Sequence, residues 1–338
     1  MSSALSIDIG TYTIKAISGK AGPKPEIERF AEVFNPLGIA VPSDEAIFQK
    51  FTDLIESIIV DHKLPKNDIR LSLPETVVST NIIELPSLSD AELASAIGWQ
   101  AEQHIPIPPD QLSLEYQVLH RPSKANRNEE KMRVLLVGAH KDLVEKYTNV
   151  FLTLGIEPKL LETQMISVLR ALDIEKQEPP TLVIQMGASS IQLAMVYEGE
   201  MRFVTTHMNG GQALTQALER QINLGTQQAE EYKRTYGLDE SQFEGKVRMA
   251  LMPVIEIIIN EIRKAMIFFT NQYPGVTAQR ILLSGGPTLL PGLVQHLTQE
   301  IGVEVLMAAP FSNATGSFPE SNHSAWTVCM GLMVREEF

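Results

Sequence analysis

Apolar residues recur along the chain with two different periods, and these periods separate predicted strands from predicted helices. Short apolar runs at residues 6–8, 13–18 and 27–34 predict three strands. Residues 46–60 repeat apolar positions at helical spacing, and a further strand is expected at 69–73. Because three strands, a helix and a strand are not a strict β-α-β alternation, we expect a mixed sheet rather than a purely parallel one.

Residues 75–139 interrupt this pattern and predict an inserted subdomain. A β-like run from Val77 to Leu85 precedes a predicted helix. Ser89 can cap that helix, because Glu92 follows at the spacing of a capping box. Two more short apolar runs complete the insertion.

The pattern restarts after a polar, proline-bearing break at residues 176–180, which we take as the domain boundary. A long apolar-rich helix is expected from Pro253 to Gln272, with the proline tolerated in its first turn. The sequence therefore predicts an α/β protein of two domains, with mixed sheets flanked by helices. The expected domains are residues 1–178 and 179–338, and the second carries a smaller helical subdomain at about 208–265.

Composition narrows the classes of function. The chain carries 41 acidic and 28 basic residues, a formal net charge of −13, which disfavours binding to nucleic acid or directly to anionic lipid. Cys329 is the only cysteine, so no intrachain disulfide can form. Neither a signal peptide nor an apolar run of roughly 18 residues is recognisable. We therefore expect a cytoplasmic protein without direct membrane insertion.

Two glycine turns, one in each half, resemble each other. The stretch IDIGTYTIKA at 7–16 aligns without gaps with the first ten residues of IQMGASSIQLA at 184–194, so that Gly10 corresponds to Gly187. Taken singly, each is better explained as an ordinary β-hairpin. Two such turns facing each other across a cleft would hold a triphosphate through backbone N–H groups and hydroxyls. The hydroxyls are those of Thr11, Thr13, Ser189 and Ser190.

A third element follows at 281–293, ILLSGGPTLLPGL, which is an apolar strand, a turn and the start of a helix. Since Gly285 and Gly286 have no Cβ, a flat ring or a ribose could lie against the backbone there. A tight strand–helix turn is the alternative interpretation of this element alone. The order of all three elements favours a nucleotide-binding cleft.

These motifs resemble those of the actin–hexokinase–chaperone ATPase superfamily. Residues 7–16 look like its first phosphate loop, MGASSIQLAMV like the second, and ILLSGGPTLLPG like the adenosine motif. Three stretches are similar to the PilM family of type IV pilus assembly proteins, namely residues 85–119, 208–218 and 228–234. The resemblance implies a two-domain actin-like (ribonuclease H-like) fold with an FtsA-like inserted subdomain, and ATP and Mg²⁺ as cofactors.

The resemblance also implies roles for individual residues. Asp8 would orient the Mg²⁺ through water, and Lys15 would reach the phosphates. Glu230 and Lys233 would lie at the edge of the adenine and ribose. The two loops and the adenosine pocket would be formed by Gly10, Thr11, Tyr12 and Thr13, by Gly187, Ala188, Ser189 and Ser190, and by Gly285, Gly286, Pro287 and Thr288.

The partner implied by the resemblance is the cytoplasmic N-terminal tail of the inner-membrane protein PilN. That peptide would dock in a groove between the first subdomain and the insertion. The chain would then be an ATP-binding adaptor of the pilus assembly platform, held peripherally at the inner membrane by its protein partners. Other pilus assembly proteins would be further contacts, and homo-oligomer formation stays open.

One position departs from the family pattern. Gln185 stands where the second phosphate loop usually carries an aspartate. A neutral amide is a poorer Mg²⁺ ligand than a carboxylate, so we expect nucleotide binding with slow or absent hydrolysis. Glu75, expected near the cleft, is a candidate for orienting water, although a solvated turn carboxylate after Pro74 is the favoured interpretation.

Two other functions stay open at this level. An FtsA-like division or cytoskeletal ATPase shares the insertion, but such chains end in an amphipathic membrane helix that the last residues here do not predict. A small-molecule kinase of the same superfamily needs a catalytic aspartate near the γ-phosphate, and none stands out. None of the seven histidines has a metal-binding spacing with another histidine or with the single cysteine.

Overall fold

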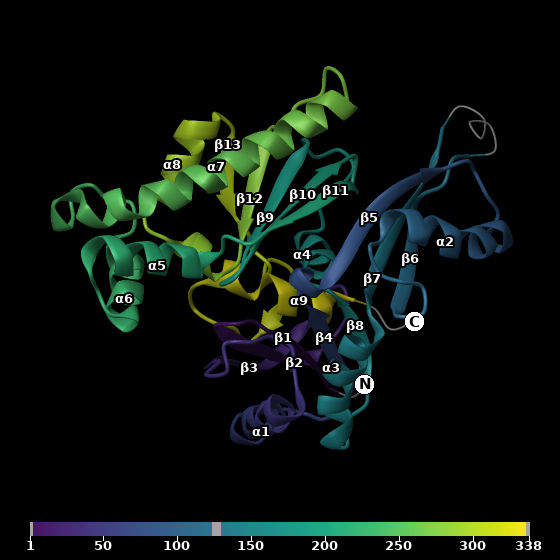
Figure 1. Cartoon of the computed structure of the whole chain (residues 1–338), viewed down its shortest axis with the longest axis horizontal. Coiled ribbons are helices and arrows are strands. Elements are labelled where there is room, and N and C mark those ends of the chain that lie inside the picture. Colours follow the sequence, from purple (N-terminus) through teal and green to yellow (C-terminus); the bar gives the residue numbers. More distant parts are fainter. Residues whose placement is uncertain (1–2, 124–129, 336–338) are drawn as a thin grey trace.

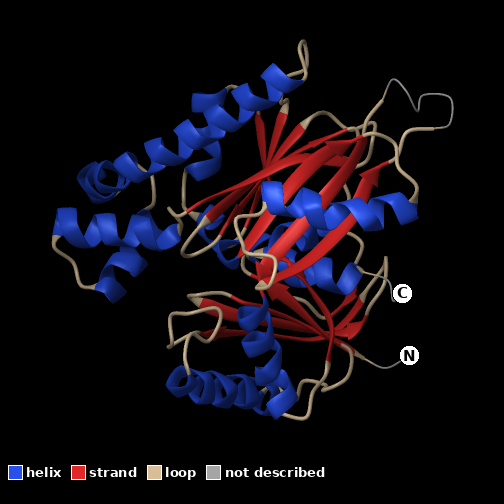
Figure 2. Cartoon of the chain, turned by 45° about the vertical axis from the view of Figure 1, so that its right-hand side comes forward, coloured by secondary structure: helices blue, strands red, loops and turns tan. Residues whose placement is uncertain are grey.

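The structure, a computed structural model, describes residues 3–123 and 130–335. A lower and an upper lobe, each built around a sheet, meet at helices α4 (Gln164–Leu172) and α9 (Thr327–Val334) (Figure 1). A third, smaller sheet stands beside them. Figure 2 shows the strands of the two lobes stacked one above the other, with helices between them.

The first lobe contains a six-stranded mixed sheet in the order β14-β3-β2-β1-β4-β8. The three N-terminal strands are antiparallel, whereas β4 and β8 run parallel to β1. The sheet is therefore mixed, as the sequence pattern predicts. Helices α1 (Glu45–Asp61) and α3 (Lys141–Thr153) pack on one face around Phe51 and Phe151. The strands are β1 (Ala4–Ile9), β2 (Thr13–Lys20), β3 (Glu26–Phe34), β4 (Ile69–Leu73), β8 (Pro158–Thr163) and β14 (Thr315–Gly316).

The insertion folds as a separate three-stranded antiparallel sheet in the order β5-β7-β6, and we call it the insert. Helix α2 covers this sheet through Leu93, Ile97 and Ala101. The predicted capping box is confirmed, because Ser89 and Glu92 each bond the other's backbone N–H. The elements are β5 (Val78–Leu85), α2 (Asp90–His104), β6 (Leu112–His120) and β7 (Met132–His140).

The second lobe repeats part of the first. Its sheet has the order β11-β10-β9-β12-β13, in which β9 pairs antiparallel with β10 and parallel with β12, just as β1 pairs with β2 and β4. The strands are β9 (Thr181–Met186), β10 (Ile191–Tyr197), β11 (Glu200–His207), β12 (Arg280–Ser284) and β13 (Glu304–Met307). The helices are α5 (Gly211–Ile222), α6 (Thr226–Tyr236), α7 (Lys246–Gln272) and α8 (Leu293–Ile301).

Two details of the sequence interpretation are wrong. Helix α7 begins at Lys246, so Pro253 lies inside it rather than in its first turn. Pro253 has no N–H to donate to the Met249 carbonyl four residues earlier. Both residues are exposed, so water can bond that carbonyl instead. Strands β8 and β14 were not predicted, because β14 has two residues and β8 is a short edge strand without a clear alternation.

The C-terminal part of the chain returns to the first lobe. Strand β14 pairs with β3, and α9 packs against α4, β1 and β4. The predicted division into residues 1–178 and 179–338 falls in the loop between α4 and β9, and it stays a prediction. Within the described part of the chain, no helix has the length and apolar character needed to cross a membrane.

The crossing of α4 and α9 generates a stability prediction. A Cβ on Gly331 would lie 1.7 Å from the carbonyl oxygen of Ser167, so the two helix backbones must separate in Gly331→Ala. We expect this variant to lose about 2–4 kcal/mol of unfolding free energy in urea denaturation. Gly98→Ala on α2 is the matched control, because no atom lies within 4 Å of the added Cβ. We expect that control to gain about 0.5–1 kcal/mol from helix propensity. Equal stabilities of the two variants would contradict the prediction.

Candidate functional site

The two glycine turns have the same internal geometry. The Gly10 N–H donates to the Thr13 carbonyl at 3.0 Å, and the Gly187 N–H donates to the Ser190 carbonyl at 2.8 Å. A Cβ would lie 2.8 Å from the Thr13 oxygen in the first turn and 3.1 Å from the Ser190 oxygen in the second. Glycine is therefore required by close backbone approach in the first turn and favoured in the second. Their similarity in sequence reflects the same turn built twice.

The second turn is buttressed by the start of α5. The Gly211 N–H donates to the Gly187 carbonyl at 3.0 Å, and the Gln212 N–H donates to the Ala188 carbonyl at 2.8 Å. A Cβ on Gly210 would lie 2.5 Å from the Ala188 oxygen. Sequence reasoning did not assign Gly210 and Gly211 to the site, although the adjacent pair of glycines was a signal. The N-terminus of α5 thereby lies at the turn, where its dipole favours an anion.

The turn after β12 lies against the same helix start. Gly285 has φ +98°, and a Cβ there would lie 2.0 Å from the Met186 oxygen, so only glycine fits. Gly286 differs, because no atom lies within 4 Å of the position of its missing Cβ. The Thr288 hydroxyl closes the turn by donating to the Gly285 carbonyl at 2.6 Å. Pro287 contacts the position of the missing Gly211 Cβ. The predicted adenosine motif and second phosphate loop are therefore neighbours, with an open backbone face at Gly286.

Two residues of opposite charge lie beside the first turn, and the ion pair of the lysine is with Glu32 on β3, at 3.2 Å. Asp8 and Lys15 are opposite each other in the β1–β2 ladder. The Asp8 carboxylate accepts hydrogen bonds at 2.8 Å from the Ser72 hydroxyl and from the Gln164 side chain at the start of α4. The buried Lys15 ammonium donates to the Thr13 hydroxyl at 2.7 Å. Ser72 and Gln164 carry no sequence motif, so sequence reasoning missed them.

The second lobe has two glutamines where the first has this charged pair. Gln185 and Gln192 face each other in the β9–β10 ladder, in the register that Asp8 and Lys15 occupy in β1–β2. Both side chains are buried, and within the described residues neither Oε1 atom has a hydrogen-bond partner. The Thr11 hydroxyl in the first turn is also buried without one. Buried acceptors are normally hydrogen-bonded, so these three oxygens are expected to have donors nearby. The water molecules around a hydrated cation would supply such donors.

Helix α6 contributes a polar cluster next to the second turn. The Lys233 ammonium donates to the Glu230 carboxylate at 2.5 Å, to the Thr215 hydroxyl at 2.9 Å and to the Gly211 carbonyl at 3.2 Å. Burial lowers the pKa of Lys233, although the Glu230 charge opposes that effect. Burial alone would raise the pKa of Glu230, but Lys233 outweighs it and the pKa is lowered. The two predicted residues thus lie together and attach α6 to the start of α5.

A contact between the two lobes lies beside the first turn. The Arg234 guanidinium on α6 lies 5.4 Å from the centre of the Tyr12 ring in the first turn, a cation–π geometry. Glu230 accepts from Arg234 at 2.8 Å and holds the guanidinium in place. The pKa of Tyr12 is raised by burial and by Glu230, while Arg234 opposes both. Because Tyr12 and Arg234 are far apart in sequence, no motif could have predicted their contact.

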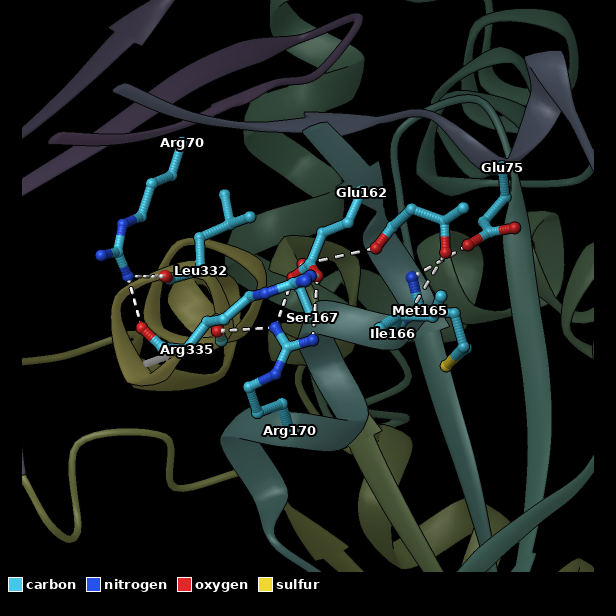
Figure 3. A network of polar contacts seen from close by, with 11 residues as sticks. Arg70, Glu75, Glu162, Met165, Ile166, Ser167, Arg170, Leu332 and Arg335 are labelled. Carbon is cyan, nitrogen blue, oxygen red and sulfur yellow. Dashed lines mark hydrogen bonds and ion pairs between the residues drawn. The ribbon is translucent and has the colours of Figure 1, made fainter. Parts of the chain in front are cut away.

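Glu75 is not the solvated carboxylate that the sequence favoured. Its side chain is buried and accepts a hydrogen bond from the Met165 N–H at the start of α4, at 2.9 Å (Figure 3). Thr80 donates a longer bond of 3.4 Å. Burial raises the pKa of Glu75, and these hydrogen bonds oppose the rise. Glu75 therefore anchors α4, and its role in orienting water stays a prediction.

A buried polar network ties α4 to the C-terminal segment (Figure 3). Glu162 accepts hydrogen bonds from Ser167 at 2.7 Å, from Arg170 at 2.8 Å and from Arg335 at 2.7 Å. Arg70 donates to two carbonyls at the end of α9, the nearer being that of Arg335 at 2.6 Å. The network fixes the position of α4, whose first residue bonds Asp8.

A separate cavity of about 690 Å³ opens between the first lobe and the insert. Lys141 joins the two walls, because its N–H donates to the Gln111 carbonyl at 2.8 Å and its ammonium donates to the Asp110 carbonyl at 2.9 Å. The remaining lining comes from the loop before α1 and the first turns of α3, and includes Pro42, Ser43, Asp142, Leu143 and Lys146.

Carboxylate clusters that could hold a metal by themselves are absent from the described residues, which contain no group of three or more His, Cys, Asp or Glu in such an arrangement. A cation beside Asp8 would therefore be held by one carboxylate, by water and by the phosphates. The orphaned oxygens of Gln185, Gln192 and Thr11 fit that arrangement, because each can accept a hydrogen bond from coordinated water.

Comparisons with known proteins identify the family. The model of the type IV pilus assembly protein PilM family matches residues 6–336. A chain of a PilM–PilN type IV pilus biogenesis complex is 24% identical, with a TM-score of 0.86, over 98% of this chain and 99% of that one.

More distant solved structures share the fold. The ethanolamine utilization protein EutJ of Carboxydothermus hydrogenoformans is 14% identical, with a TM-score of 0.57, over 99% of this chain and 90% of that one. MreB5 of Spiroplasma citri, bound to AMPPNP, is 12% identical, with a TM-score of 0.53, over 97% of this chain and 94% of that one. These neighbours confirm the predicted two-domain actin-like fold.

Proposed function

The chain belongs to the type IV pilus assembly protein PilM family, and from that premise we propose that it is an ATP-binding adaptor of the pilus assembly platform. The observation that carries the proposal is the pair of matched glycine turns, one in each lobe, beside the open backbone face at Gly286. The family match favours this function over division and small-molecule kinase activities, because it covers nearly the whole chain.

ATP would lie between the two turns with its adenosine on the second lobe. The backbone N–H groups of the Gly10 and Gly187 turns would bind the phosphates, together with the Lys15 ammonium. Asp8 would orient a hydrated Mg²⁺, which when bound neutralises phosphate charge. The open face at Gly286 would receive the nucleoside beside the Glu230–Lys233 cluster. MreB5, which shares the fold, was solved with AMPPNP bound, and this supports nucleotide binding as such.

Hydrolysis would be slow or absent, because the second lobe presents neutral amides to the phosphates. Gln185 and Gln192 offer carbonyl oxygens but no negative charge, so they bind a cation more weakly than a carboxylate and cannot accept a proton from attacking water. Bound ATP would then act mainly by holding the two lobes at one angle.

The macromolecular partner would be the cytoplasmic tail of a PilN-like inner-membrane protein. The similar chain of known structure was solved in a complex with PilN. We assign the tail to the cavity of about 690 Å³ between the first lobe and the insert, because residues of both the first lobe and the insert line it. The protein would accordingly be cytoplasmic and would reach the inner membrane through this partner. Its contacts with other pilus assembly proteins are a further expectation.

Nucleotide binding can be tested by thermal unfolding. We expect saturating Mg-ATP to raise the melting temperature, since about 2.7 kcal/mol is gained at a ligand concentration of 100 Kd. Gly286→Val should keep the fold, because a Cβ at this position meets no atom within 4 Å, yet lose this ATP-dependent rise by filling the nucleoside face. Gly98→Ala, also in open space but on the insert, should keep the full rise. A wild-type protein that does not respond to Mg-ATP would overturn the proposal.

Hydrolysis can be tested by phosphate release. We expect the wild-type turnover to be below about 10⁻³ s⁻¹, the range of GTPases that lack an activating residue. Gln185→Asp restores a carboxylate and should raise the rate at least about tenfold. Gln212→Asp, at the start of α5, controls for an added charge in this region. A wild-type turnover well above about 10⁻³ s⁻¹ would contradict the proposal that hydrolysis is slow or absent.

Docking of the tail can be tested with a synthetic peptide. A PilN-type N-terminal peptide should bind the ATP-loaded protein in isothermal titration calorimetry. Leu143→Arg places a long charged side chain in the cavity and should weaken this binding at least about tenfold. Lys264→Glu on α7, an exposed position in the second lobe, should leave it unchanged. Equal affinities for the two variants would place the peptide elsewhere.

A further inference from the structure

The insert also contacts the second lobe, through an ion cluster centred on Glu200. Glu200 begins β11, which lies next to β5 and β6. Arg133 on β7 donates its Nε–H to the Glu200 carboxylate at 3.1 Å. His120 on β6 lies 3.3 Å from the other carboxylate oxygen. Two residues of the insert therefore hold one carboxylate of the second lobe.

Glu200 is fixed within its own lobe by Arg202. The Arg202 side chain is only 1% exposed and lies 3.4 Å from the Glu200 carboxylate. It also pairs with Glu198 at 2.9 Å and donates to the Tyr197 carbonyl at 3.0 Å. Its guanidinium lies over the rings of Tyr197 and Tyr273, at 5.2 and 5.4 Å. A displacement of Glu200 is therefore transmitted to the second sheet and to α7.

Apolar packing also joins the insert to the second lobe, because Leu135 on β7 lies in one buried cluster with Val196 and Met201. Beside this cluster, a cavity of about 310 Å³ lies at the junction of the insert, α4 and the second lobe. Protein interiors are normally close-packed, so the junction is less tightly packed where the cavity lies. Glu200 itself belongs to the lining. The apolar lining includes Val118 and Leu135 of the insert, Ile166 and Leu169 of α4, and Val196 and Met201 of the second lobe.

The ion cluster and the Tyr12–Arg234 contact lie on opposite sides of the helix crossing. Figure 1 shows α6 on the left, the insert on the right, and α4 and α9 between them. The Tyr12–Arg234 contact joins the lobes on the α6 side. Rotation about the crossing that opens the cleft at α6 must also displace β11 relative to the insert. The Arg133–Glu200 pair resists that displacement.

We propose that the Arg133–Glu200 ion pair helps to set the angle between the lobes, on the side opposite the Tyr12–Arg234 contact, and we call this pair the tie. The cleft is the proposed nucleotide site between the two glycine turns. Loss of the tie populates more open arrangements, from which a ligand of the cleft dissociates faster. Because the insert also lines the proposed tail-binding cavity, the tie links that cavity to the cleft, and the effect is reciprocal. The inference rests on the proposed function only in taking ATP as the ligand of the cleft.

The first test needs no nucleotide. Spin labels are attached to cysteines introduced at Glu56 on α1 and Asn260 on α7, both exposed, while Cys329 stays buried and unlabelled. Pulsed electron paramagnetic resonance then measures the distribution of distances between the lobes. We expect Arg133→Met to broaden the distribution, because methionine keeps an apolar stem but cannot donate to Glu200. Arg121→Met removes an ion pair with Asp90 inside the insert and should leave it unchanged.

The second test measures dissociation of a fluorescent ATP analogue after addition of excess ATP. We expect dissociation to be about 3- to 10-fold faster in Arg133→Met and unchanged in Arg121→Met. Identical distance distributions in Arg133→Met and the wild type would overturn the tie. A broadened distribution with an unchanged dissociation rate would overturn its link to the cleft. If the wild-type protein does not bind the analogue, the proposed function fails, and the distance distributions alone decide on the tie.

Discussion

The crossing of α4 and α9 is the contact on which the position of everything else depends. Gly331 lets the α9 backbone touch the α4 backbone at Ser167, and the Glu162 network bonds both helices to the edge of the first sheet. Helix α4 leads into the second lobe, and α9 follows the return of the chain to the first lobe at β14, so the two helices pack against each other where the lobes meet. The Gln164 side chain extends from it to Asp8, so the crossing also determines the geometry beside the first turn.

The two lobes repeat one strand-turn-strand unit but give it different charges. In the first lobe the unit carries Asp8 opposite Lys15, and in the second it carries Gln185 opposite Gln192. An anionic ligand with a hydrated cation would therefore be held electrostatically from one side and through neutral hydrogen bonds from the other. Under the proposed function, such a site would favour retention of a nucleotide over its chemical conversion, which would suit a protein whose output is an assembly contact.

The insert is joined to both lobes, and the two junctions differ in kind. Against the first lobe it is held by backbone bonds at Gln111 and Lys141, beside the larger cavity. Against the second lobe it is held by side chains, namely the charged residues around Glu200 and the buried apolar cluster of Leu135, Val196 and Met201, beside the smaller cavity. Backbone continuity fixes the first junction, whereas side-chain ion pairs can separate at modest cost in free energy. The second junction is therefore the one suited to change with the angle between the lobes.

The sequence by itself determined the elements and the turns, because hydrophobic period and glycine placement act over a few residues. The capping box at Ser89, the repeated turns at Gly10 and Gly187 and the turn at Gly285 are such local features. Only the tertiary structure decided which distant residues these features contact. Glu75 became a buried anchor of α4, while Tyr12 came to face Arg234. These contacts join residues distant in sequence, so their energies depend on how the lobes pack and leave no periodic or motif-like trace in the chain.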